Sequence, residues 1–124
     1  MLRKPAFILV TLGLLAMGEP AFAQKTGPNG GLVEGKGSHQ TELVISATEL
    51  TVYLLENGKP HDTKGMNLRA VIQEAGTTST ITFANQDGKR MIAKLPTALN
   101  KGAIVVLTGK DHHGDAVGAR YVIK

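Results

Sequence analysis

Apolar and polar residues alternate with a period of two in several short runs after residue 31, which is the pattern of strands with one buried face. In residues 39–45, His39 shares one side of the strand with Leu43. Residues 50–55 follow a short polar turn and repeat the alternation with residues that suit a pleated surface. These two runs predict a β-hairpin at the start of the fold.

The alternation returns in later runs that are separated by turn residues. Asn57-Gly58 and Asp87-Gly88 favour tight turns because these residue types tolerate positive φ. The strands expected in this part of the chain lie at 66–73, 77–83, 91–95, 103–108 and 117–123. The run at 103–108 is the most apolar of them, so we expect a central strand that is buried on both faces.

This spacing predicts the fold class. Roughly seven or eight short strands at intervals of about 8 to 12 residues are typical of an antiparallel β-sandwich of immunoglobulin-like type. No segment shows the periodicity of a long helix, although the connector at 97–102 has room for one helical turn at 98–100. We therefore expect an all-β protein.

Residues 1–23 differ in character from the rest of the chain. They begin with Arg3 and Lys4, continue with an apolar run at 6–17 and end in Ala-Phe-Ala at 21–23. This order of a basic start, a short apolar stretch and small residues is that of a secretory signal peptide. A membrane-spanning helix needs about 20 apolar residues, so this run is too short to anchor the protein.

The domain organisation follows from that signal. We expect cleavage after Ala23, a flexible lead-in at 24–31 and one β-sandwich domain at 32–124, located in the periplasm without membrane insertion. The chain contains no cysteine, which excludes disulfides, thiolate metal sites and thiol catalysis. Stability must therefore come from an ordinary apolar core.

Charge and motifs exclude several functions. The formal net charge is +4, and it becomes +3 once Arg3, Lys4 and Glu19 are removed with the signal peptide. The basic residues are scattered and lack interleaved aromatic residues, which argues against nucleic-acid binding. No serine stands in a Gly-x-Ser-x-Gly motif and no glycine-rich loop opens a helix, so we do not expect an enzyme.

The imidazole and thioether side chains are the candidate metal ligands. His112 and His113, between Asp111 and Asp115, could hold Cu(II), Ni(II) or Zn(II) if the turn bends between the two histidines. The competing interpretation is a solvated polar turn.

A second candidate pair follows the Asn-Gly turn. His61 and Met66 could share a Cu(I) ion across a loop, because a soft ion favours a thioether. Met66 also lies on the apolar face of its strand, where methionine commonly fills a core. His39 begins a strand and is a further candidate ligand; the competing interpretation, which its position favours, is a half-exposed histidine that is hydrogen-bonded to its neighbours.

Gly30-Gly31 and the segment 39–44 (His-Gln-Thr-Glu-Leu-Val) resemble a small exported β-sandwich module that occurs alone or attached to periplasmic adaptor subunits of heavy-metal efflux pumps. The resemblance implies a non-catalytic periplasmic domain that handles copper, silver, zinc or cobalt. His39 and Glu42 match the family pattern, so the resemblance implies that both are candidate metal ligands. Asn29 stands where the family often has a histidine, so the resemblance supports fold and compartment more strongly than a metal site.

Two functions are compatible with the sequence. The first is a periplasmic domain that binds or passes on a copper, silver or zinc ion, or that supports a heavy-metal efflux system through an efflux-pump adaptor. The second is a metal-free module that docks another envelope protein. Histidines that converge in space would favour the first function, and scattered histidines the second. The oligomeric state is left open.

Overall fold

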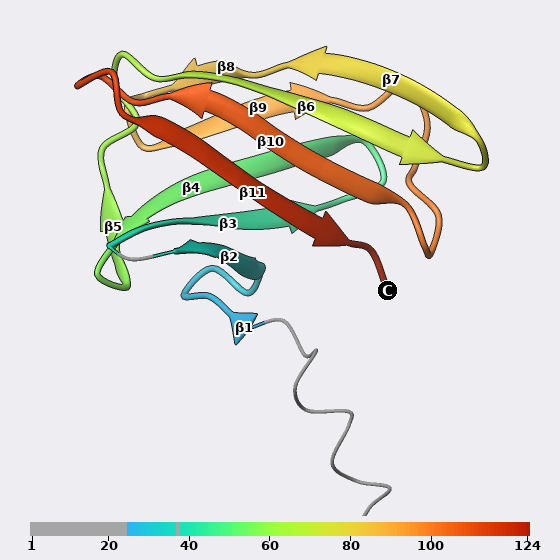
Figure 1. The fold of residues 1–124 in the computed structure, drawn as a ribbon, viewed down its shortest axis with the longest axis horizontal. Coiled ribbons are helices and arrows are strands. Elements are labelled where there is room, and N and C mark those ends of the chain that lie inside the picture. Colours follow the sequence, from blue (N-terminus) through green and yellow to red (C-terminus); the bar gives the residue numbers. More distant parts are fainter. Residues whose placement is uncertain (1–24, 37) are drawn as a thin grey trace, which may run out of the picture.

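The computed structural model describes residues 25–36 and 38–124 and shows antiparallel strands throughout this part of the chain (Figure 1). The strands are β1 (Lys25–Thr26), β2 (Leu32–Lys36), β3 (His39–Ile45), β4 (Glu49–Glu56), β5 (Lys59–His61), β6 (Asn67–Glu74), β7 (Thr77–Thr82), β8 (Ala84–Gln86), β9 (Arg90–Lys94), β10 (Ile104–Lys110) and β11 (Ala116–Val122). The described residues contain no helix, so the expected turn at 98–100 does not form.

The strands make two sheets. One has seven strands in the order β1-β2-β3-β4-β9-β8, with β5 also paired to β4, and the other has four strands in the order β11-β10-β6-β7. The prediction of an all-β antiparallel fold is confirmed. Three of the eleven strands, β1, β5 and β8, have two or three residues, which leaves eight longer ones. The immunoglobulin-like topology stays a prediction.

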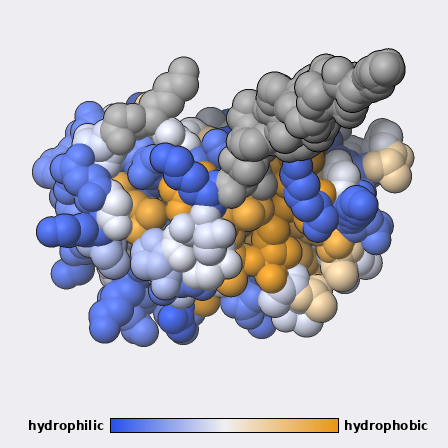
Figure 2. All heavy atoms as spheres, turned by 90° about the horizontal axis from the view of Figure 1, so that it is seen from below, coloured by the Kyte–Doolittle hydropathy of each residue, from blue (hydrophilic) through white to orange (hydrophobic). Residues whose placement is uncertain are grey.

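The two sheets are joined differently on their two sides. On one side β7 runs on into β8 through Phe83, so the chain passes from the four-stranded to the seven-stranded sheet within one extended segment. On the other side β11 lies against β2 and β3. Figure 2 views the molecule from below, the side on which β1 and β2 lie in Figure 1, and shows apolar surface between polar side chains.

The core lies between the sheets and takes alternate residues from both. Met66 and Met91 are 6% and 1% exposed and belong to this core, together with the apolar faces expected around them. In β10, Val105 is fully buried, whereas Val106 on the other face is only partly buried and Thr108 is exposed. The prediction of a strand buried on both faces was therefore wrong. The position of β10 between β11 and β6 is central, but the outer face of the four-stranded sheet is not completely covered.

The two tight turns predicted from sequence have the expected backbone. Asn57 and Gly58 connect β4 to β5 with φ values of 53° and 81°, and Asp87 and Gly88 connect β8 to β9 with 56° and 67°. Two consecutive residues with positive φ are the mark of the turns that match the twist of a hairpin. The local sequence therefore determines these two reversals.

A buried tyrosine links the sheets next to one end of the sandwich. The Tyr121 hydroxyl on β11 donates to the carbonyl oxygen of Thr41 on β3 at 2.7 Å. The Thr41 hydroxyl lies 2.6 Å from the Tyr121 phenol oxygen. Burial raises the pKa of Tyr121 well above its usual value, with the Thr41 side-chain hydrogen bond opposing that shift. The phenol therefore stays neutral and holds β3 against β11 close to His39.

The N-terminal expectations fall partly outside the structure. The predicted signal peptide, 1–23, lies outside the described residues. From Lys25 on, the expected lead-in contains β1, which pairs with β2, and a loop closed by the bond from the Gly27 amide to the Gly31 carbonyl oxygen at 2.8 Å. Across the described residues, no helix combines the length and apolar character needed to cross a membrane.

Candidate metal site at one end of the sandwich

All four histidines of the chain lie at the same end of the sandwich, the left-hand end in Figure 1. His39 begins β3, His61 ends β5, and the other two lie in the turn between β10 and β11. Three carboxyl groups lie among them. We call this group the histidine rim; its members are His39, Glu56, His61, Asp111, His112, His113 and Asp115.

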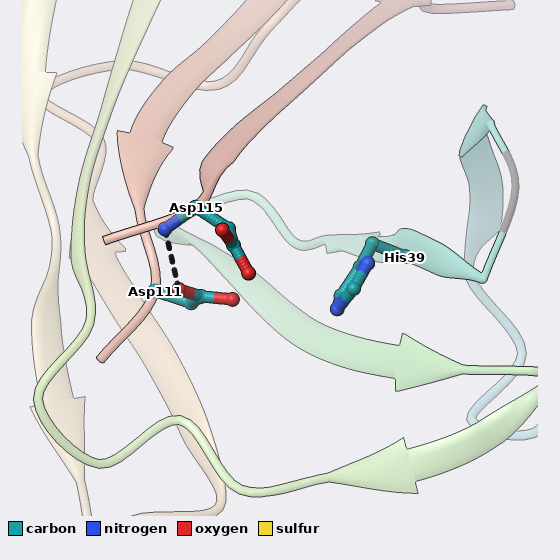
Figure 3. Close-up of side chains that lie close together, drawn as sticks. All are labelled: His39, Asp111 and Asp115. Carbon is teal, nitrogen blue, oxygen red and sulfur yellow. Dashed lines mark hydrogen bonds between the residues drawn. The ribbon is translucent and has the colours of Figure 1, made fainter. Parts of the chain in front are cut away.

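Three members of the histidine rim could share one ion. His39, Asp111 and Asp115 each offer one ligand atom, and these atoms all lie within 4.8 Å of one another (Figure 3). Figure 3 shows the imidazole of His39 on one side of a gap and the two carboxylates, which flank the β10–β11 turn, on the other. The group therefore brings together the start of β3 in the seven-stranded sheet and the turn that connects two strands of the four-stranded sheet.

The β10–β11 turn is built around Asp111. Its carbonyl oxygen accepts the Gly114 amide at 3.0 Å, and its side-chain Oδ1 accepts the amides of His113 and Asp115 at 2.9 and 2.8 Å. Aspartate commonly organises turns in this way because its short side chain reaches the backbone a few residues on. One carboxylate oxygen thus holds the turn, and Oδ2 is left for a ligand.

The same hydrogen bonds control the charge of Asp111. The amide of Asp115 is the main cause that lowers the pKa of Asp111 below its usual value of 3.8; partial desolvation opposes this effect, and the His113 amide adds to it. Donors that point at a carboxylate favour its ionised form. Asp111 is therefore a charged ligand at any pH where imidazole can bind a metal.

The lowered pKa gives a testable acid dependence. Because Asp111 binds its proton more weakly in the folded protein, its contribution to stability is fully present above about pH 4 and is lost as the pH falls through the lowered pKa. In urea unfolding, the parent should be less stable at about pH 2.5 than at pH 7. This difference in the free energy of unfolding should be smaller for Asp111→Asn. Asp115→Asn, at an exposed position in the same turn, is the matched control and should keep the difference of the parent. Equal acid sensitivity in Asp111→Asn and the parent would contradict this account.

Glu56 connects His39 to His61. It lies directly opposite His39 in the β3–β4 pairing and shares a face with His61, which pairs with Leu54. Glu56 Oε2 is 3.7 Å from His39 Nε2, and Oε1 is 3.3 Å from His61 Nδ1. The Nδ1 atom of His39 lies 3.3 Å from the Ser38 hydroxyl oxygen, so Nε2 is the nitrogen that faces the rim.

The β10–β11 turn also brings its own histidines together. The ring centroids of His112 and His113 are 3.9 Å apart, which shows that the turn bends between these neighbours. The His61 ring stacks on His112 with a centroid distance of 6.3 Å and an interplanar angle of 21°. Gly65 packs so closely that an added Cβ would lie 2.9 Å from the Cβ of His112. The loop before β6 therefore positions this turn.

Two of the residues predicted from sequence are not members of this group. Glu42 is on the opposite face of β3 from His39 and is completely buried. Its Oε2 accepts the amides of Asn29 and Gly31 at 2.8 and 2.7 Å, and its Oε1 accepts the Asn29 side-chain amide at 3.0 Å. The carboxylate that matches the family pattern thus fastens the β1–β2 loop.

Met66 is the other residue that is not brought to the rim. It is buried in the core, whereas the His61 ring contacts Glu56 and His112. The structure therefore favours the core interpretation of this methionine over a shared His61–Met66 ion. His39, His61, His112 and His113 are the candidates that the fold gathers.

Sequence reasoning missed the partners of His39. Glu56 could have been found, because the hairpin pairing that places Ile45 opposite Leu50 also places His39 opposite Glu56. The Asp111 and Asp115 carboxylates were recognised beside His112 and His113, but their approach to His39 depends on the packing of the two sheets. No pattern along the chain signals that contact.

Comparisons with protein-family models, curated proteins and solved structures give no match for this chain. The fold and the histidine rim define a small all-β protein with candidate metal ligands at one end. Function has to be argued from that site, because a β-sandwich by itself is compatible with many activities.

Proposed function

We propose that this protein is a periplasmic, non-catalytic domain of immunoglobulin-like type that binds a divalent transition-metal ion through His39, Asp111 and Asp115. The observation that carries the proposal is the convergence of their ligand atoms within 4.8 Å from two different sheets. Ligands bonded at about 2.0 to 2.2 Å to one zinc ion lie roughly 3 to 4 Å apart. Side-chain movements of about 1 Å would therefore close the group on an ion.

The ligand chemistry selects the metal class. One imidazole and two carboxylates suit Zn(II), Cu(II) or a similar divalent ion, whereas Cu(I) and Ag(I) favour sulfur. Met66 and Met91 are buried in the core, so neither thioether is presented at the histidine rim. Zn(II) and Cu(II) are thus the favoured members of the copper, silver and zinc group.

Three protein ligands suit an ion that is passed on. Structural zinc sites are usually closed by four protein ligands, while three leave one position for water or another donor. The Asp115 carboxylate is exposed, so a partner can reach the ion from solvent. This supports a role in delivering metal to an efflux-pump adaptor or another envelope protein.

Binding should stabilise the fold. With Zn(II) or Cu(II) at about 100 times its Kd, we expect the free energy of unfolding to rise by about 2.7 kcal/mol, which for a domain of about 100 residues raises Tm by roughly 10 °C or more. Thermal unfolding of the exported protein with Zn(II), Cu(II), Cu(I) and Ag(I) measures this. The rise should shrink near about pH 5, because imidazole must release its proton to bind metal.

The variants assign the site. His39→Ala should remove most of the rise, whereas Met66→Leu, which conserves volume, should leave it unchanged. A second candidate, the metal-free docking module, is favoured by the apolar surface on the side of β1 and β2 (Figure 2). If no metal shifts Tm at neutral pH, or if His39→Ala responds as the parent does, the metal proposal is lost and the docking module replaces it.

A further inference from the structure

Glu56 has an arrangement that a single-ion site does not require. Its two oxygens face two different imidazoles, with Oε2 3.7 Å from His39 Nε2 and Oε1 3.3 Å from His61 Nδ1. A carboxylate with one oxygen toward each of two nitrogen ligands can bridge a pair of metal ions, and paired ions in proteins lie about 3.5 to 4 Å apart.

The hairpin register holds Glu56 in this position. Glu56 is the direct partner of His39 in β3, and its other neighbour, His61, lies on the same face of β5. The three side chains are 33% to 42% exposed. Ion pairs at such exposure contribute little to stability. Stabilisation of the fold therefore does not explain why His39, Glu56 and His61 lie together.

A further imidazole lies beyond His61. The His112 ring stacks on His61, and it is carried by the exposed part of the β10–β11 turn, where it can rotate toward an ion beside His61. Glu56 Oε1 and His61 therefore form a second pair of possible ligands, and the His112 ring would have to turn toward them to make a group as close as that of His39, Asp111 and Asp115. This pair is separate from the atoms of Asp111 and Asp115.

We infer that the histidine rim binds two divalent ions bridged by Glu56, the first held by His39, Asp111 and Asp115 and the second by His61 and His112. This inference rests on the proposed function, because the first ion is the one proposed above. With both ions bound, Glu56 occupies the fourth position of the first ion, and exchange passes through the second ion, which lies on the exposed, turn side of the rim. The second ion gives the site a position at which an incoming or outgoing ion can bind before exchange.

The test is the number of ions bound. The full chain is expressed, the exported product is purified, and its titration with Zn(II) at neutral pH is followed by calorimetry. We expect two ions per chain for the parent and one for Glu56→Gln and for His61→Ala. Glu49→Gln, at the other end of the same strand, is the matched control and should keep two. Circular dichroism confirms that each variant is folded.

A spectroscopic measurement distinguishes bridging from mere proximity. With Cu(II), the parent should show electron spin coupling between two ions, and Glu56→Gln should show the spectrum of one isolated ion. One ion in the parent, unaffected by Glu56→Gln or His61→Ala, would overturn the second ion and leave the proposed function standing. Two ions retained by Glu56→Gln would overturn the bridge, and no binding at all would remove both proposals.

Discussion

Val105→Asp is expected to lower the free energy of unfolding by about 4 kcal/mol or more, which is enough to unfold many small domains. Val105 is fully buried in β10, the strand between β11 and β6. A carboxylate at this position would face the core without a hydrogen-bond donor, and burying an unpaired charge is strongly unfavourable. Urea unfolding, followed by circular dichroism, measures the change in free energy.

Two further variants make this result interpretable. Thr80→Asp introduces the same charge on the exposed face of β7 and should cost less than about 1 kcal/mol. Val105→Ala removes two methyl groups without adding charge and should cost roughly 2 kcal/mol, from about 0.8 kcal/mol per buried methylene and a cavity term. Similar losses for Val105→Asp and Thr80→Asp would contradict the position assigned to the core.

Glu42→Ala should be the second most damaging substitution, with a loss of roughly 3 kcal/mol. The change removes the acceptor for three hydrogen bonds and leaves the buried amide of Gly31 without its partner. An added Cβ at Gly27 would lie 2.5 Å from the Glu42 carboxyl carbon, so the loop is shaped to the carboxylate. Unfolding in urea gives the magnitude, and hydrogen exchange at the Gly31 amide shows whether the loop is released.

Titration with Zn(II) tests whether Glu42 has this structural role or is a metal ligand. Glu42→Ala protein that remains folded should bind Zn(II) with the same stoichiometry as the parent, because Glu42 and His39 lie on opposite faces of β3. Glu49→Ala, at the other end of the adjacent strand, should cost less than about 1 kcal/mol. If folded Glu42→Ala protein binds fewer Zn(II) ions than the parent, Glu42 is a metal ligand and this account is wrong.

The strands were predictable because their signal is local. Alternation of apolar and polar residues placed β3 and β4 within a residue or two, and the Asn57-Gly58 pair predicted the turn after them. The error in β10 has a physical cause. Val106 is apolar like Val105, and composition cannot tell whether a second layer covers the outer face of a sheet.

The candidate site was predictable only in part. The sequence identified all four histidines as possible ligands, because without cysteine few other soft or borderline donors exist. It also assigned Glu42 and Met66 to the site. Their actual roles depend on the β1–β2 loop for Glu42 and on the facing sheet for Met66.

The sequence by itself determined the class of fold, the turn positions and the kinds of ligand available, because each follows from residues that are close in the chain. Only the tertiary structure decided which ligands meet. His39 and Asp111 are brought together when β11 packs against β2 and β3, and the Tyr121–Thr41 hydrogen bonds hold that packing. Contacts between residues about seventy positions apart depend on how the two sheets bury their shared core, and no local pattern records that arrangement.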